Sequence, residues 1–136
     1  MKRLILLLVF CLFEYANATE ISSVVVKVIA KSDKSWDGMK LPAYPKGNPE
    51  VTILDITIPP HTKLHWHKHP VINAGILVKG KLTVIKEDGE TLKLKEGDTI
   101  VELVETWHYG VNESDKPAQI IVFYAGIKNK PVTILK

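Results

Sequence analysis

Cysteine is almost absent from this sequence. Its 136 residues contain one, Cys11, which lies inside an N-terminal apolar run. If that run is removed, the remaining chain has no thiol and can form no disulfide. Any metal site in that remainder must then use histidine or oxygen ligands.

A membrane-spanning apolar run is also missing from the N-terminus. The apolar stretch from residue 4 to residue 13 follows Met-Lys-Arg and precedes Ala16-Asn17-Ala18. About ten apolar residues are too few to cross a ~30 Å hydrocarbon core as a helix. The pattern is instead typical of a signal peptide with an A-x-A cleavage site, whereas Phe10 is too bulky for a lipoprotein signal ending at Cys11. We predict a signal peptide at 1–18 and one mature domain at 19–136, periplasmic or secreted, with no stable membrane anchor.

The sequence has no strong excess of charge of either sign. It contains 18 basic and 15 acidic residues. Without Lys2, Arg3 and Glu14, 16 basic and 14 acidic residues remain, a net charge of +2. The basic residues are also scattered singly, without a block that would follow a phosphate backbone. This balance argues against nucleic acid as a partner.

No convincing helical period runs through residues 19–136. Short β-branched segments alternate with turn signals, which predicts an all-β fold. The expected strands cover residues 23–30, 51–58, 63–69, 71–78, 82–86, 91–94, 98–101, 107–111 and 119–125.

Three further segments carry specific expectations. Asp88-Gly89 between two alternating runs predicts a hairpin with a two-residue type I′ turn. Residues 32–49 are rich in Gly, Pro and Lys and predict an ordered loop. It is either a flap that brings Trp36 and Tyr44 to a ligand or, the favoured alternative, an arm covering a sheet edge. Residues 119–126 are apolar on both faces, which predicts a strand covered on both sides.

Histidine is concentrated in two places. Four of the five histidines lie between His61 and His69, and the fifth is His108. Alternation along a strand directs His65, His67 and His69 to one face. Residues two apart lie about 6.6 Å apart, which two imidazoles can bridge to one ion. His108, in an aromatic segment typical of a strand, is the remaining histidine that can supply a third ligand. Converging imidazoles favour a transition metal.

These residues resemble the cupin superfamily, whose first motif reads G-x5-H-x-H-x(3,4)-E-x6-G. His67-Lys68-His69 is followed after three residues by Asn73 and after six more by Gly80. Here Asn73 replaces the family's glutamate ligand, and His61 replaces the opening glycine. An asparagine offers a carbonyl oxygen but no negative charge, so the ion would keep its full positive charge and favour an anionic ligand.

The second cupin motif, G-x5-P-x-G-x2-H-x3-N, fits from Gly97. Leu103, Glu105, His108 and Asn112 stand at the expected offsets, although Leu103-Val104-Glu105 replaces the family's Pro-x-Gly turn. Asn112 is thereby accounted for as a turn residue. Its Asn-Glu-Ser glycosylation sequon is treated as a chance match.

The resemblance implies one antiparallel jelly-roll β-barrel, commonly paired as a homodimer. It further implies one divalent transition metal ion (Fe, Mn, Ni, Cu or Zn) held by His67, His69, His108 and Asn73. The alternative pair, His65 with His67, leaves Asn73 one residue too far away. With the preferred pair, His67 and His69, His65 would be a proton shuttle or a further donor near the metal.

Other residues near the motifs are candidates for contact with a substrate. Glu102 and Glu105 flank the second motif and either is a candidate general base, although the turn between them hides which faces inward. His61 lies on the turn before the first motif. The aromatics Trp107 and Tyr109 are candidate ligand contacts, against a general expectation of wall packing.

Three functions remain open from the sequence. The first is a metalloenzyme acting on a small oxygenated or anionic molecule, as cupin dioxygenases, decarboxylases and isomerases do. The second is a non-catalytic protein that binds a metal or a small ligand in the cell envelope. The third is a structural cupin that retains unused histidines.

Overall fold

The computed structural model describes residues 23–136, and the predicted signal peptide at 1–18 lies outside them. The described part is built from antiparallel strands and contains no helix. The strands are β1 (Pro49–Ile58), β2 (Thr62–Lys63), β3 (His67–Lys68), β4 (Asn73–Lys79), β5 (Lys81–Lys86), β6 (Thr91–Lys95), β7 (Thr99–Val101), β8 (His108–Asn112), β9 (Ala118–Ile127) and β10 (Ile134–Leu135).

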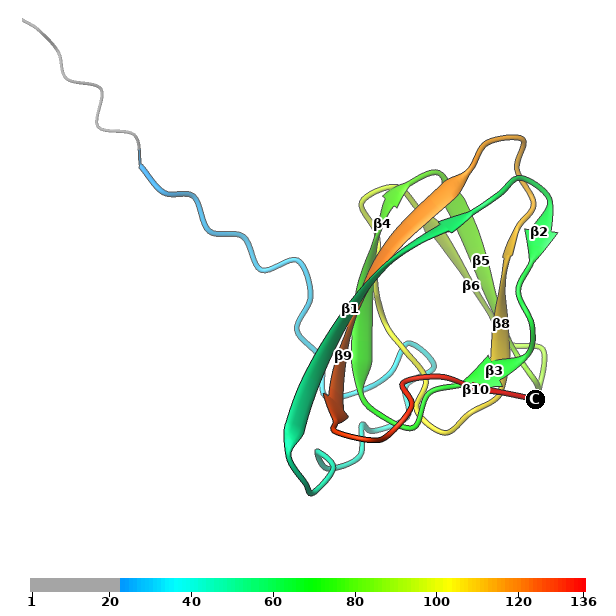
Figure 1. Cartoon of the computed structure of the whole chain (residues 1–136). Coiled ribbons are helices and arrows are strands. Elements are labelled where there is room, and N and C mark those ends of the chain that lie inside the picture. Colours follow the sequence, from blue (N-terminus) through cyan, green and yellow to red (C-terminus); the bar gives the residue numbers. More distant parts are fainter. Residues whose placement is uncertain (1–22) are drawn as a thin grey trace, which may run out of the picture.

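Two sheets face each other and enclose the interior of a barrel (Figure 1). One sheet has the order β1-β9-β4-β7, and the other has the order β10-β3-β8-β5-β6, with β2 added to β8. Except in the β5–β6 hairpin, neighbouring strands of each sheet are far apart in sequence, as in a jelly roll. The predicted all-β, single-barrel fold is confirmed.

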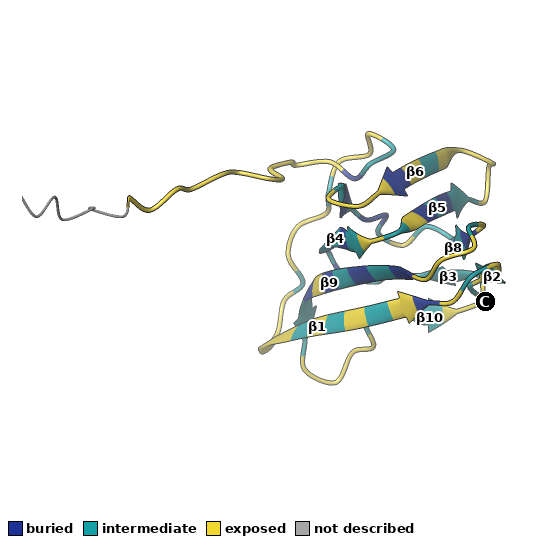
Figure 2. Ribbon diagram, turned by 90° about the horizontal axis from the view of Figure 1, so that it is seen from above, coloured by how far each residue is buried: buried dark blue, intermediate teal, exposed yellow. Residues whose placement is uncertain are grey.

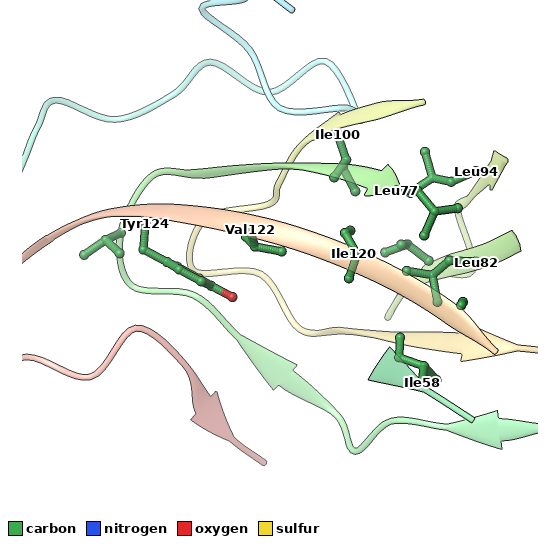
Figure 3. Close-up of a cluster of buried hydrophobic side chains, with 11 residues drawn as sticks. Ile58, Leu77, Leu82, Leu94, Ile100, Ile120, Val122 and Tyr124 are labelled. Atoms are coloured by element: carbon green, nitrogen blue, oxygen red, sulfur yellow. The ribbon is translucent and has the colours of Figure 1, made fainter. Parts of the chain in front are cut away.

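The core lies between the sheets, where alternate residues of each strand point inward. In β9, Ile120, Val122 and Tyr124 are buried, whereas Phe123 between them is exposed. Figure 3 shows these three side chains with Leu77 and other residues of the cluster. The buried and exposed bands of Figure 2 follow the same alternation.

The predicted and observed strands differ where a segment has no neighbouring strand along its whole length. Residues 23–30 form no strand, because they extend from the barrel with every residue exposed. The segment 63–69 is split into β2 and β3, which pair with β8 separately. The sequence analysis also missed β10, whose two residues pair with β3.

The hairpin between β5 and β6 has a longer loop than predicted. The Gly89 amide donates to the Lys86 carbonyl, and the Lys86 amide donates to the Glu90 carbonyl. Gly89 has φ 91°, but Asp88 does not have a positive φ. A type I′ turn needs positive φ at both central residues, so this is a three-residue loop with glycine at the left-handed position.

The loop 32–49 behaves as an arm over a sheet edge. The Trp36 amide donates to the Val101 carbonyl of the edge strand β7, and the indole packs against the core. The Asp37 carboxylate accepts from the Lys86 ammonium of β5 at 3.2 Å. Tyr44 is exposed on the surface. Trp36 therefore packs against the core and Tyr44 lies at the surface, so neither aromatic of this loop forms a flap over a ligand.

Candidate metal centre

Three histidine side chains meet inside the barrel. His67 of β3 pairs directly with His108 of β8, and His69 follows β3 on the same face as His67. The ring centroids lie 4.5 Å apart for His67 and His108, and 5.1 Å apart for His69 and each of the other two. One nitrogen from each ring lies within 4.8 Å of the other two. The structure therefore gathers the three histidines predicted as ligands.

The backbone fixes which nitrogen of each ring is free. His67 Nδ1 lies 2.8 Å from the His65 carbonyl, His69 Nδ1 lies 2.9 Å from the Val132 carbonyl, and His108 Nδ1 lies 2.8 Å from the Thr106 carbonyl. Carbonyl oxygens only accept, so each Nδ1 carries the proton and donates it. Each Nε2 then keeps its lone pair, which is the arrangement of a metal-binding imidazole with an anchored ring.

Burial keeps the rings neutral. Loss of hydration lowers the pKa of His69 to about 3 and the pKa of His108 to about 4, and it also lowers the pKa of His67. Each of these rings is also next to another imidazole, whose charge would oppose protonation. At neutral pH the three Nε2 atoms are lone-pair donors that need no deprotonation before binding a metal.

A carboxylate points into the same space. Glu102, directly after β7, has a side chain that is 10% exposed, and its Oε2 lies 3.6 Å from His108 Nε2. Neither atom has a hydrogen-bond partner within the described chain. Burial raises the pKa of Glu102 to about 7. Glu105, the other candidate general base, lies on the outer surface and pairs with Lys68.

Asn73 is buried next to this carboxylate but is not among the residues that line the cavity. Its Nδ2 donates to the Val71 carbonyl at 3.1 Å, whereas its Oδ1 has no partner in the described chain. Asn73 pairs across the sheet with Tyr124, and its own carbonyl accepts from the Glu102 amide. Its ligand role remains a prediction.

The histidines form one end of a cavity of about 260 Å³. Its polar end holds Glu102, Tyr124 and Thr133 beside the three rings, and His65 also lines it. Its other walls are apolar side chains, namely Leu54, Ile56, Ile58, Leu64, Leu82, Val84, Ile120, Val122 and Leu135. Pockets of this kind bind small molecules through a few convergent polar groups.

Three predicted ligand contacts lie away from this cavity. Tyr109 packs edge-on against Trp66 at 4.6 Å between centroids, on the outer face of β8. Trp107 lies beside the ammonium groups of Lys68 and Lys136. The exposed ring of His61 pairs with Asp115 at 2.8 Å. The structure therefore does not bring these three side chains to the histidines.

Two parts of the site had no clear sequence signal. Val132 anchors His69 through its carbonyl, and a main-chain acceptor leaves no mark in a sequence. Tyr124 reads as one more apolar residue of β9, yet its ring centroid is 5.4 Å from that of His69. Burial and the nearby Glu102 carboxylate raise the pKa of this tyrosine to about 12, so its hydroxyl keeps its proton.

Comparison with known families agrees with this fold. The family described as Cupin domain matches residues 54–124, just over half of the sequence. The matched segment contains His67, His69, His108 and Glu102. The chain belongs to the cupin family. A search of curated proteins finds no match.

Solved structures share the fold at low sequence identity. The DMSP lyase DddQ from Ruegeria pomeroyi is 17% identical with a TM-score of 0.55, over 63% of this chain and 43% of its own. Oxalate oxidase in complex with the substrate analogue glycolate is 20% identical with a TM-score of 0.53, over 62% and 45%.

A smaller neighbour is an uncharacterized Klebsiella pneumoniae protein with a double-stranded beta-helix domain. It is 17% identical with a TM-score of 0.55, over 67% of this chain and 86% of its own. The matches to the lyase and the oxidase span less than half of those chains. At these identities the likeness shows the fold alone.

The residues present fit a bound metal ion. Three neutral imidazoles with anchored rings form a donor set suited to zinc, copper, iron or nickel. The Nε2 of one of them, His108, is buried without a hydrogen-bond partner in the described chain.

The described part of the chain has no helix that could span a membrane.

Proposed function

We propose that this cupin binds one divalent transition metal ion (Fe, Mn, Ni, Cu or Zn) through His67, His69 and His108 and acts on a small molecule in the adjoining cavity. The observation that carries the proposal is the set of three backbone-anchored imidazoles at the polar end of an otherwise apolar cavity. When bound, the ion would act as a Lewis acid toward an oxygen of the substrate.

The cavity also defines the kind of substrate. Its polar end suits an oxygenated or anionic group, and its aliphatic walls suit a compact apolar body and exclude water from it. His65 and Tyr124 also line the cavity and offer hydrogen-bonding groups to a substrate. The proposed reaction is of the dioxygenase, decarboxylase or isomerase type. Oxalate and glycolate, named for one neighbour, and DMSP, named for another, are useful first probes.

A non-catalytic metal or ligand carrier is the competing proposal, because the family's glutamate position is Asn73. The aliphatic cavity beside the histidines favours the enzyme, since a carrier of the ion alone needs no such space. Conversion of a probe by the metal-loaded protein separates the two. Tight binding of a probe without any conversion would favour the carrier.

Removal of one ligand tests the metal site. We expect His69→Ala to reduce bound metal from about one ion per chain to a small fraction, because two imidazoles hold a divalent ion far less firmly than three. Bound metal is measured by elemental mass spectrometry on the untagged protein. His61→Ala is the matched control, since His61 is exposed and away from the cavity.

Metal retained in the His69→Ala variant at the wild-type level would contradict the proposed site. Circular dichroism of both variants shows whether the barrel is still folded. Loss of turnover together with loss of metal, in a folded His69→Ala protein, would assign the chemistry to this site.

We also propose that two copies pair through the outer face of β1 and β9. Val51 is 59% exposed, Ile53 is 64% exposed and Phe123 is 43% exposed, and Ile53 lies directly opposite Phe123. Exposed apolar residues grouped on one face of a sheet are typical of an interface. A second copy fits because a two-fold axis lets the same patch serve both sides.

Export is a further proposal, and it rests on the sequence of residues 1–18 alone. We propose that the chain is cleaved after Ala18 and works in the periplasm or outside the cell. Sequencing the N-terminus of the protein from a periplasmic extract should give Thr19 as the first residue, and an N-terminus at Met1 would contradict the proposal.

A further inference from the structure

We propose that Glu102 is a fourth metal ligand and takes over the part that the cupin motif assigns to the glutamate at the position of Asn73. This inference rests on the proposed metal site and states what completes it. Glu102 follows the end of β7, the strand next to β4, which begins with Asn73.

The sheet places the two residues side by side. Ala74 of β4 pairs with Val101 of β7, and the Glu102 amide donates to the Asn73 carbonyl at 3.0 Å. Residues opposite each other on antiparallel strands point to the same face. Tyr124 of β9 lies opposite Asn73 on the other side. Tyr124, Asn73 and Glu102 therefore form a row on the face that looks into the barrel.

Of Asn73 and Glu102, only Glu102 lines the cavity with the histidines. Its Oε2 lies 3.6 Å from His108 Nε2. Two ligand atoms at about 2.1 Å from one ion and at tetrahedral angles are about 3.4 Å apart, so the observed spacing suits a shared ion. The exposed Glu105, three residues later, is directed away from the cavity.

One oxygen of the Glu102 carboxylate has no partner. The side chain is nearly buried, and Oε2 makes no hydrogen bond within the described chain. An unpaired carboxylate is costly to bury, and buried charges are normally paired or bound to a metal. A cation held by the three histidines would be that partner.

Asn73 fits the same arrangement as a positioning residue. A glutamate there would put a second carboxylate next to Glu102, and like charges side by side on a sheet repel. The neutral amide avoids this and is fixed by its hydrogen bond to the Val71 carbonyl. In this arrangement Glu102 would lower the charge of the occupied site by one unit, so the ion would not keep its full positive charge.

The test compares two variants with the same change in charge. Glu102→Gln and Glu105→Gln each remove one carboxylate, but only the first is taken from the cavity. Dissociation constants for Mn²⁺ and Zn²⁺ are measured by calorimetric titration of the metal-stripped protein. We expect Glu102→Gln to weaken binding by at least about tenfold, as loss of a group that tunes a metal site does. Glu105→Gln should leave binding unchanged.

The exchange Asn73→Glu/Glu102→Gln supplies a second test that also restores the family's pattern. It should regain most of the lost affinity, and the Mn²⁺ electron paramagnetic resonance spectrum should then resemble that of the wild type. Glu102→Gln alone should alter that spectrum. Unfolding curves of the metal-stripped proteins confirm that each variant folds.

The possible results separate this inference from the proposed function. Equal affinity and an unchanged spectrum in Glu102→Gln, while His69→Ala loses the metal, would overturn the role of Glu102 and leave the histidine site standing. Absence of binding by the wild type after incubation with either metal would overturn both. Weaker binding in Glu102→Gln and Glu105→Gln alike would show only a general charge effect and would also overturn the inference.

Discussion

Asn112 illustrates how one side chain can join three segments of the chain. Its Nδ2 donates to the carbonyls of Ile58, Pro59 and Lys116, and its Oδ1 accepts from the Ser114 amide and hydroxyl. The residue is fully buried. The asparagine that ends the second cupin motif therefore holds the end of β1 against the turn between β8 and β9.

We predict that Asn112→Asp destabilises the barrel by about 3 kcal/mol or more. The carboxylate keeps the size and the acceptor of the amide but offers no donor to the three carbonyl oxygens, and the lost hydrogen bond to the Ile58 carbonyl is buried. Urea unfolding of the wild type and the variant measures the difference. Asn48→Asp, at an exposed position, is the control. A loss below about 1 kcal/mol would show that the side chain is not needed for this connection.

The sequence was sufficient to group the three histidines as candidate metal ligands but not to place the carboxylates. His67 and His69 share a face because strand residues alternate, and that rule needs no tertiary information. Glu102 and Glu105 are separated by a turn in which Glu105 has φ 53°, so alternation gives no answer there. Trp107 and Tyr109 are half-buried on the outer face, beside lysines that come from distant segments, and a single sequence does not reveal such contacts.

At the scale of elements, the turn from β4 to β5 is the tightest constraint on the sequence. Gly80 has φ 80°, and a Cβ atom there would lie 2.6 Å from the Pro117 carbonyl oxygen. Gly89, in the turn from β5 to β6, has φ 91° but nothing within 4 Å of its Cβ position. The two glycines share their backbone conformation and differ in the space around them.

We predict that Gly80→Ala costs about 3 kcal/mol of unfolding free energy and that Gly89→Ala costs about 1 kcal/mol. Both substitutions place an alanine in the left-handed conformation, which is unfavourable. Only Gly80→Ala also forces the β8–β9 turn to move, because its Cβ would meet the Pro117 carbonyl oxygen. Thermal unfolding of the two variants beside the wild type measures the difference. Equal losses would show that the close contact at Gly80 relaxes without cost.

Element prediction succeeded where strands are long and have neighbours throughout. β1 and β9 pair over their full ten residues, and both were predicted within a few residues of their observed bounds. Residues 23–30 have the same β-branched composition but no neighbouring strand in the described chain. β10 is only two residues long, too short for any periodic pattern. Pairing partners, which a single sequence does not reveal, decide these cases.

At the scale of the whole molecule, the barrel separates two apolar surfaces. The inner one forms the core and the walls of the cavity. The outer one lies on β1 and β9, where exposed positions alternate with half-buried ones along β1 (Figure 2). The prediction that β9 is covered on both sides is met only on its inner face, since Phe123 is exposed. The proposed second copy would provide the missing cover.

Ile53→Asp should therefore give a monomer. It places a charge at the centre of the proposed interface, where Ile53 meets Phe123, and a buried unpaired charge opposes association. Light scattering coupled to gel filtration should give twice the chain mass for the wild type and the single chain mass for the variant. The metal content should stay the same, because the histidines lie inside each barrel.

Thr57→Asp is the matched control, since Thr57 lies on the same strand and the same face but beyond the apolar patch, opposite Gln119. It should leave the mass of the wild type unchanged. A wild type that is monomeric at concentrations near 100 μM, or an Ile53→Asp variant that still pairs, would contradict association through this face. A specific dimer normally covers about 800 Å² on each partner, so one buried charge at its centre should be decisive.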